Sequence, residues 1–410
     1  MIVACLLTMM TPCKLFFPER NCRRVRPIFL ERNPNGPKEA MLIQYFNPRY
    51  VAYGNTNVSI AQLAPDGLSQ VKTQQVFSGP TNMQGVEGNR LYKINGTYYV
   101  LDDSPQGVTF IWKSSKIWGP WTSKILQSNI NGPINGGNIN GQGSLVQGPD
   151  GQWHFMAFGW AYPAGRIPVM APITWGSDGW PSLVEVNGAW GSSYQYPASS
   201  PAAVTVTGTG KDTFAGTSLS PEWEWNFNPD ETKYSVSNGI KLSTVTVTQD
   251  LYAARNTLTH RLYGASPIGT AEIDFSNMAD GDRVGLATFR DQSAWIEIYR
   301  SGSIYSVRMV GNATQDPSNS WKTITNGTIE GTATIAKGKV WLRTSMNVLP
   351  TSNKEAKFAY STDGTTFQSL GTPFTMTTDY RYFTGYRYGI FYFATKALGG
   401  SVKVQSFTSA

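Results

Sequence analysis

The feature that most constrains the fold is a tight turn between two apolar runs. Asn95-Gly96 separates the run 90–94 from the run 97–101. Because Asn-Gly readily adopts the left-handed backbone of a two-residue turn, these runs are predicted to pair as an antiparallel hairpin. A second hairpin is predicted around Pro149-Asp150-Gly151, and Asp150 lies 55 residues after Asn95. That spacing is typical of propeller blades with inserted loops.

The composition favours the same class of fold. The chain of 410 residues holds 41 glycines and 24 prolines, and only 15% of its residues are charged. Long stretches of Ala, Glu, Lys and Leu, which helices need, are missing, whereas short strands joined by Gly- and Asn-rich turns do not need them. We therefore predict an all-β protein.

The second half of the chain shows a different pattern. Residues 270–275, 294–299 and 340–344 alternate apolar and polar side chains, which predicts sheets with one buried face and hence a β-sandwich. The preceding stretch is rich in Pro, Ser, Gly and Thr, as a linker is. We therefore divide the chain into an unassigned leader (1–45), a partial β-propeller (46–195), a linker (196–211) and a β-sandwich (212–410).

Charge and cysteines are concentrated at the start of the chain. The net charge is +7, but beyond residue 40 there are 27 basic and 24 acidic residues, a balance of only +3. No basic face is apparent there, so we expect no nucleic-acid partner. Cys5, Cys13 and Cys22 are the three cysteines and His154 and His260 the two histidines. We therefore expect neither a zinc site nor a Cys/His nucleophile in the folded part.

The sequence also bears on location. It has no apolar run long enough to span a bilayer, so we expect no membrane association. The first ten residues are apolar but lack a basic start and a clear cleavage site, and they make an unconvincing signal peptide. Asn-x-Ser/Thr acceptors at Asn57, Asn95, Asn312 and Asn326 favour a secreted protein. We expect an extracellular monomer.

Few acidic side chains in the first domain are placed for catalysis. Glu87 precedes Asn95 by eight residues, and Gln142 precedes Asp150 by the same eight. If the two hairpins are equivalent, Glu87 and Gln142 occupy matching positions on inner strands that face a central channel. Small neighbours in a partly dry channel favour a carboxyl that stays protonated, as a general acid requires. The alternative is that Glu87 is a solvated turn residue.

Arg166 is the second candidate, in the segment 164–168. Its guanidinium presents a rigid fork of donors that suits hydroxyl groups or a carboxylate. The alternative is an ordinary loop arginine.

Several stretches together resemble a known family. In register they are 57–67, 86–100, 141–146, 165–175 and 177–181. They resemble glycoside hydrolase family 43, particularly its fungal β-xylosidase and α-L-arabinofuranosidase-like members, from about Val51 to the C-terminus. Residues 214–226 and 383–396 are similar to the concanavalin A-like sandwich appended to many of these enzymes. The resemblance implies a five-bladed β-propeller followed by a concanavalin-like β-sandwich (jelly roll) that can close the substrate pocket.

The resemblance also implies a reaction. The family cleaves glycosidic bonds with inversion, using three acids, and its general acid matches Glu87. The family arginine that contacts substrate or base matches Arg166, and Gln142 is expected to bind substrate. The implied substrate is plant cell-wall arabinoxylan, from which terminal xylose or arabinose is released. No cofactor is expected, and a structural cation in the channel is left open.

The chain departs from the family pattern at two places. The first-blade Asp that serves as general base has no counterpart, because residues 41–48 contain no Asp, and Gly141 stands where many members have His. Loss of a general base typically costs about 10²–10⁴-fold in rate. We therefore predict an N-terminally truncated, impaired enzyme. A non-catalytic carbohydrate-binding remnant and an incomplete gene model of an active enzyme are the alternatives.

Overall fold

The computed structural model describes residues 48–105, 107–138, 140–195 and 208–410. These residues form 27 strands and two short 3-10 helices, η1 (Glu231–Lys233) and η2 (Leu251–Ala253), so the all-β prediction is confirmed. The expected leader 1–45, with its three cysteines, and residues 196–207 of the expected linker lie outside the described residues.

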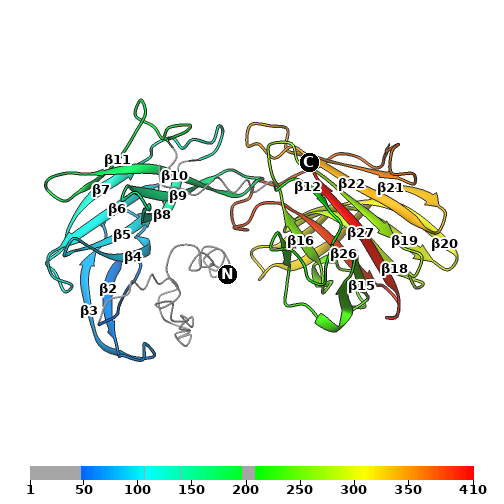
Figure 1. Ribbon diagram of the computed structural model, residues 1–410, viewed down its shortest axis with the longest axis horizontal. Coiled ribbons are helices and arrows are strands. Elements are labelled where there is room, and N and C mark those ends of the chain that lie inside the picture. Colours follow the sequence, from blue (N-terminus) through cyan, green and yellow to red (C-terminus); the bar gives the residue numbers. More distant parts are fainter. Residues whose placement is uncertain (1–47, 106, 139, 196–207) are drawn as a thin grey trace. The chain divides into compact units, whose positions relative to one another are not determined.

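The chain divides into two compact units, whose residues can be located by the colour bar of Figure 1. Of the described residues, the first unit comprises 48–105 and Phe110–Lys124, and the second comprises Gly107–Thr109 and the described residues from Ile125 to Ala410. The second unit therefore holds the last sheet of the propeller-like part as well as the sandwich.

The propeller-like part consists of small up-and-down sheets. A three-stranded sheet holds β1 (Tyr50–Tyr53), β2 (Asn57–Leu63) and β3 (Gln70–Ser78). A four-stranded sheet holds β4 (Glu87–Ile94), β5 (Thr97–Ser104), β6 (Val108–Ser114) and β7 (Thr122–Ser128). Another holds β8 (Asn140–Gln147), β9 (Trp153–Trp160), β10 (Arg166–Trp175) and β11 (Pro181–Leu183). Each strand lies beside the next in sequence, as in propeller blades.

Both predicted hairpins form. Ile94 pairs with Thr97, and the turn residues Asn95 and Gly96 have φ values of 49° and 84°, which is the left-handed backbone that the Asn-Gly pair predicts. The second hairpin joins β8 to β9 through residues 148–152, where the Gly151 amide donates to the Gly148 carbonyl at 2.9 Å.

The remaining residues form a sandwich of two antiparallel sheets. The nine-stranded sheet contains β12 (Gly210–Asp212), β14 (Tyr234–Val236), β15 (Ile240–Ser243), β17 (Ile268–Asp274), β22 (Lys339–Met346), β23 (Glu355–Ser361), β24 (Gln368–Ser369), β25 (Phe374–Thr375) and β27 (Ser401–Ser409). The seven-stranded sheet contains β13 (Trp223–Trp225), β16 (Leu258–Arg261), β18 (Asp282–Phe289), β19 (Gln292–Ser301), β20 (Ile304–Asp316), β21 (Lys322–Ile335) and β26 (Arg387–Ala394). β12 starts at Gly210, two residues before the expected start of the sandwich.

The sandwich core follows from the alternation seen in the sequence. Ile273 and Leu342 from one sheet and Leu286, Ile296 and Ile390 from the other belong to one buried cluster. Each is fully excluded from solvent, and burying such a side chain contributes about 1.5–3 kcal/mol. The neighbours of these residues along each strand point to the opposite face of the sheet. In the seven-stranded sheet that face is also buried, against the prediction of one buried face, and its cluster includes Ala287, Trp295 and Phe391. The predicted sandwich is confirmed.

Candidate functional site

Glu87 opens strand β4 in a segment that is tied to a neighbouring turn. The Val86 amide donates to the Asn55 carbonyl at 2.9 Å, and Asn89 Nδ2 donates to the Gly54 carbonyl at 2.8 Å. The Asn89 side chain is 1% exposed. These two bonds hold the backbone on both sides of Glu87, whose side chain is partly exposed. The carboxyl group therefore projects from a fixed backbone rather than from a loose turn.

A β-bulge follows Glu87. Glu87 pairs with Asp103 and the next pair is Arg90 with Leu101, so β4 advances three residues while β5 advances two. One extra residue in a strand bends it and redirects its side chains, and bulges are frequent beside active sites.

Strand β8 carries the same irregularity in the other unit. Its register shifts between Gly141 and Ser144, and Gln142 lies inside the bulge with φ 30°, as Gly88 does in β4 with φ 69°. Glu87 precedes its bulge, so the backbone aligns Gln142 with Gly88, one residue beyond Glu87. Strands β4 and β8 are therefore equivalent, as expected, and each carries a bulge. The expected match of Glu87 with Gln142 is wrong by one residue.

Two further acids lie on β5, the strand that pairs with β4. Asp103 is opposite Glu87 across the β4–β5 pair and is 5% exposed. Asp102 is 2% exposed and accepts a hydrogen bond from Trp112 Nε1 at 3.2 Å. Burial raises the pKa of Asp102 well above its ordinary value, the Trp112 hydrogen bond opposes this shift, and the charge of Asp103 adds to it.

Sequence reasoning did not identify Asp103 as a site residue. A regular hairpin about residues 95 and 96 places residue 103 opposite residue 88, so counting from the turn would have brought it within one residue of Glu87. The extra residue in the bulge shifts the register by one, so Asp103 lies opposite Glu87 instead of Gly88.

Arg166 opens strand β10, and aromatic rings surround its guanidinium. The Cζ atom lies 4.5 Å from the Phe158 ring centroid and 4.4 Å from those of Trp160 and Phe383, within the range of cation–π attraction. Its Nε atom is buried and has no hydrogen-bond partner among the described residues. A buried donor without a partner costs about 1–3 kcal/mol, and a ligand oxygen would remove that cost.

Phe383 belongs to a sandwich loop, residues 376–386, that contacts the segment before Arg166. Tyr162 Oη donates to the Phe383 carbonyl at 3.2 Å, and the Tyr386 amide donates to the Pro163 carbonyl at 3.1 Å. Burial raises the pKa of Tyr162, and the positive charge of Arg166 opposes that shift. All of these residues lie in the second unit.

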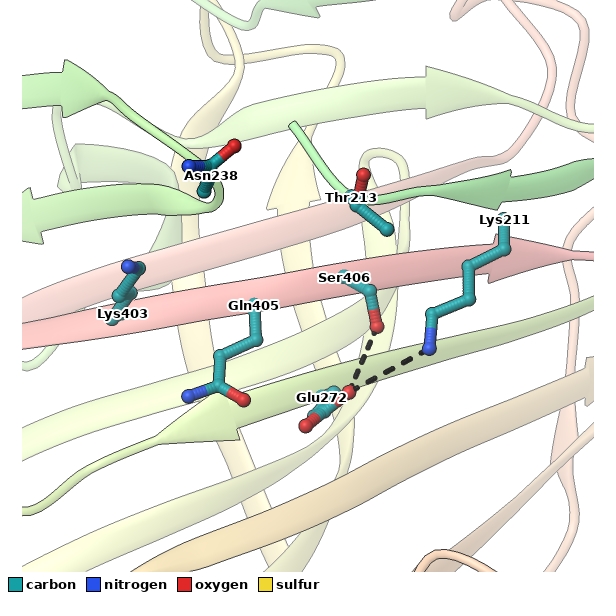
Figure 2. A pocket seen from close by; sticks show the side chains of 7 residues that line it. All are labelled: Lys211, Thr213, Asn238, Glu272, Lys403, Gln405 and Ser406. Atoms are coloured by element: carbon teal, nitrogen blue, oxygen red, sulfur yellow. Dashed lines mark hydrogen bonds and ion pairs between the residues drawn. The ribbon is translucent and has the colours of Figure 1, made fainter. Parts of the chain in front are cut away.

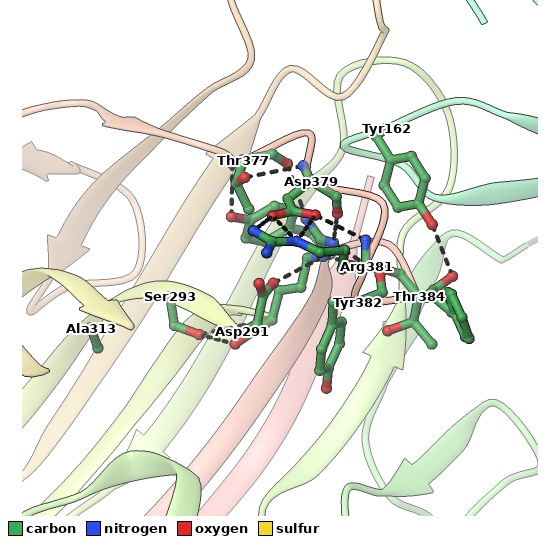
Figure 3. Close-up of polar contacts among 12 residues, drawn as sticks. Tyr162, Asp291, Ser293, Ala313, Thr377, Asp379, Arg381, Tyr382 and Thr384 are labelled. Atoms are coloured by element: carbon green, nitrogen blue, oxygen red, sulfur yellow. Dashed lines mark hydrogen bonds and ion pairs between the residues drawn. The ribbon is translucent and has the colours of Figure 1, made fainter. Parts of the chain in front are cut away.

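A buried side chain, Arg290, adds further bonds to this loop, whose residues Thr377, Asp379, Tyr382 and Thr384 are labelled in Figure 3. Arg290 is 1% exposed, and its guanidinium donates to four loop carbonyls. These are Thr384 at 3.1 Å, Thr377 at 3.1 Å, Tyr382 at 2.9 Å, and Asp379. Arg290 Nε also lies 3.2 Å from an oxygen of Asp291. The position of Phe383 against Arg166 therefore depends on Arg290, more than 90 residues earlier in the chain.

Two of the three candidate residues predicted from the sequence, Gln142 and Arg166, lie on the same sheet. Gln142 lies near the start of β8 and Arg166 starts β10, at the same end of one sheet with β9 between them. Glu87 belongs to the first unit.

In the part of the chain that the structure describes, no group of three or more His, Cys, Asp or Glu side chains could hold a metal ion. No helix in these ranges is long and apolar enough to cross a membrane.

Family models match both parts of the chain. Residues 41–181 match the model for glycosyl hydrolases family 43, and residues 211–409 match the β-xylosidase C-terminal concanavalin A-like domain.

Individual proteins are similar over longer spans. A β-xylosidase of Formosa agariphila is 25% identical over 87% of this chain and 64% of its own length. A non-reducing end α-L-arabinofuranosidase of Bacteroides ovatus is 26% identical over 50% of this chain and 41% of its own length. This chain therefore spans less than two thirds of either relative.

A solved structure is more similar still. It is that of a family 43 glycoside hydrolase engineered in its active site to display both endo-xylanase and exo-arabinofuranosidase activity. It is 40% identical, with a TM-score of 0.84, over 88% of this chain and 71% of that one.

Proposed function

This chain belongs to glycoside hydrolase family 43, and on that premise we propose that its site serves the hydrolysis of glycosidic bonds to terminal xylose or arabinose in plant arabinoxylan. The observation that carries the proposal is the similarity to a family 43 hydrolase over both the propeller-like part and the sandwich. The xylosidase and arabinofuranosidase relatives support the choice of a plant polysaccharide as substrate.

We assign Glu87 the role of general acid. It is the acidic side chain at the start of β4, the first strand of its sheet, beside a bulge, and its backbone is fixed on both sides. In inverting hydrolysis one carboxylic acid protonates the leaving oxygen while a second carboxylate activates water on the opposite face of the sugar. Glu87 would give its proton to the oxygen of the departing sugar or alcohol.

Arg166 and Gln142 are assigned to substrate binding. The unpartnered Nε–H of Arg166 would donate to a sugar oxygen, and the surrounding rings hold the guanidinium in one orientation. Gln142 has both a donor and an acceptor for sugar hydroxyl groups and lies at the same end of the sheet.

The test compares leaving groups in Glu87→Gln. Rates are measured on a 2,4-dinitrophenyl glycoside, whose phenol departs without a proton, and on an unsubstituted phenyl glycoside, whose phenol needs one. If Glu87 is the acid, the variant loses about 10²–10⁴-fold on the second substrate and far less on the first. Azide is included in parallel reactions so that an external nucleophile can take the place of water activated by a base.

Other outcomes would contradict the assignment. Equal losses on both substrates would remove Glu87 from the role of acid. No release of either phenol, with or without azide, would contradict hydrolysis by this chain and favour the carbohydrate-binding alternative.

A further inference from the structure

The outer face of the nine-stranded sheet carries a polar cavity of about 400 Å³ (Figure 2). Lys211, Glu272, Lys403, Gln405 and Ser406 line it, from strands β12, β17 and β27. Its volume is within the range of small-molecule sites. None of these residues belongs to the candidate catalytic site.

Strand alternation points Lys403 into solvent. Its neighbours Val402 and Val404 are buried in the sandwich core, so Lys403 projects from the opposite face. Lys241 lies directly opposite Lys403 in the β15–β27 pair and is also exposed. Like charges directly opposite each other destabilise a sheet, so this pair has a cost that a bound anion would reduce.

Glu272 is the one acid that lines the cavity, and two lysines already approach it. Lys211 Nζ lies 3.9 Å and Lys339 Nζ 3.7 Å from its carboxylate, which also accepts a hydrogen bond from Ser406 Oγ at 3.0 Å. Lys339 Nζ donates to Gln405 Oε1 at 2.7 Å. The negative charge of Glu272 is therefore matched without Lys403.

A second carboxylate lies close to the cavity. Asp274 pairs in register with both Lys403 and Lys339, and one of its oxygens accepts from the Ser276 amide at 3.0 Å. Four lysines (211, 241, 339 and 403) thus share this part of the face with two carboxylates, Glu272 and Asp274. The excess of positive charge selects an anionic ligand over a neutral one.

The neighbouring polar groups suit a sugar. Ser406 has a hydroxyl and Gln405 an amide that can pair with sugar hydroxyl groups. Trp341, opposite Glu272 on β22 and partly exposed, adds aromatic surface on which an apolar sugar face can pack.

We propose that this cavity binds the carboxylate of a uronic acid substituent on the polysaccharide substrate, with Lys211 and Lys403 as its counter-charges. The choice of a polysaccharide as the carrier of that carboxylate rests on the proposed function. A binding site on the sandwich would keep a substituted xylan chain attached while the hydrolytic site acts on it.

The test uses two soluble probes of equal length, neutral xylotetraose and a xylotetraose bearing one glucuronic acid. Binding to the intact chain is measured by titration in low salt. We expect the acidic probe to bind at least about tenfold more tightly, and raising the salt to 0.5 M to remove most of that difference, since exposed charges are screened. The double variant Lys211→Gln/Lys403→Gln should bind both probes alike. Both lysines are exposed, so the variant should fold normally.

Lys322→Gln is the matched control, because Lys322 is an exposed lysine on β21 of the other sheet. It should bind the acidic probe as the unchanged protein does. Equal binding of both probes by the unchanged protein, or equal loss in the control, would overturn the proposal. Competition by inorganic sulfate at the concentration of the acidic probe would show a site for any anion and would also overturn it.

The outcome is separable from that of the hydrolysis assay. If the acidic probe binds and its binding depends on the lysines, but neither phenol is released, this site is supported and the proposed function fails. Hydrolysis of neutral aryl glycosides without selective binding of the acidic probe would reject this site alone.

Discussion

Replacing Arg290 by Met should release the sandwich loop 376–386 and destabilise the protein. Arg290 is buried, donates to four loop carbonyls and pairs with Asp291. Methionine can fill much of the volume but leaves the carbonyls and the Asp291 carboxylate without their donor. Removing one partner of a buried ion pair costs about 3–5 kcal/mol. We take that as the expected loss in the free energy of unfolding, because the freed carbonyls regain water once the loop opens.

The loss should depend on pH through Asp291. Burial raises the pKa of Asp291 above its ordinary value of 3.8, and the charge of Arg290 opposes that shift. A carboxyl whose folded pKa is raised contributes most to stability below pH 3.8, and that contribution is lost as pH rises through the folded pKa. Without Arg290 the folded pKa rises further, so Arg290→Met should lose more stability at neutral pH than near pH 3.8.

Urea unfolding and hydrogen exchange of the amides in 376–386 provide the readouts. The double variant Arg290→Met/Asp291→Asn removes the stranded charge and should recover part of the loss at neutral pH. Arg255→Met is the control, because Arg255 is exposed and donates to the carbonyls of Asn228 and Pro229. A loss below about 1 kcal/mol in Arg290→Met, typical of an uninvolved site, together with unchanged exchange in the loop, would refute the reasoning.

Two further substitutions test the propeller-like sheets. Asp102→Asn should raise the free energy of unfolding at neutral pH, because burial raises the pKa of Asp102 well above 3.8. The gain should vanish below pH 3.8, where the carboxyl is protonated in both the folded and the unfolded state. Urea titrations at several pH values will measure both effects. A loss of stability at neutral pH would contradict this. Gly143→Ala should destabilise by about 1–3 kcal/mol, since its Cβ would lie 2.0 Å from the Phe155 ring and 2.7 Å from the Met156 carbonyl oxygen. Thermal unfolding checks it, and an unchanged midpoint would show that the bulge can relax.

The sequence by itself determined the elements and the class of fold. Asn95-Gly96 could be identified as a hairpin turn because the conformation of a turn depends on the residues within it. The alternation in 270–275 and 340–344 predicted a two-sheet sandwich because neighbouring side chains in a strand point to opposite faces. The position of Glu87 at the start of a strand followed from its distance to that turn.

Only the tertiary structure decided how these elements meet. The bulges at Gly88 and Gln142 changed the register by one residue, and no local sequence rule fixes where a strand takes an extra residue. The loop that carries Phe383 is held by Arg290, which bonds carbonyls 87 to 94 residues later in the chain. These four acceptors are backbone groups, which any sequence would supply. The lysines at 211, 241, 339 and 403 are scattered along the chain, and strand pairing alone brings them onto one face. Local conformation depends on residues that are adjacent in the sequence, whereas the charge and contacts of a site depend on which strands lie side by side in the fold.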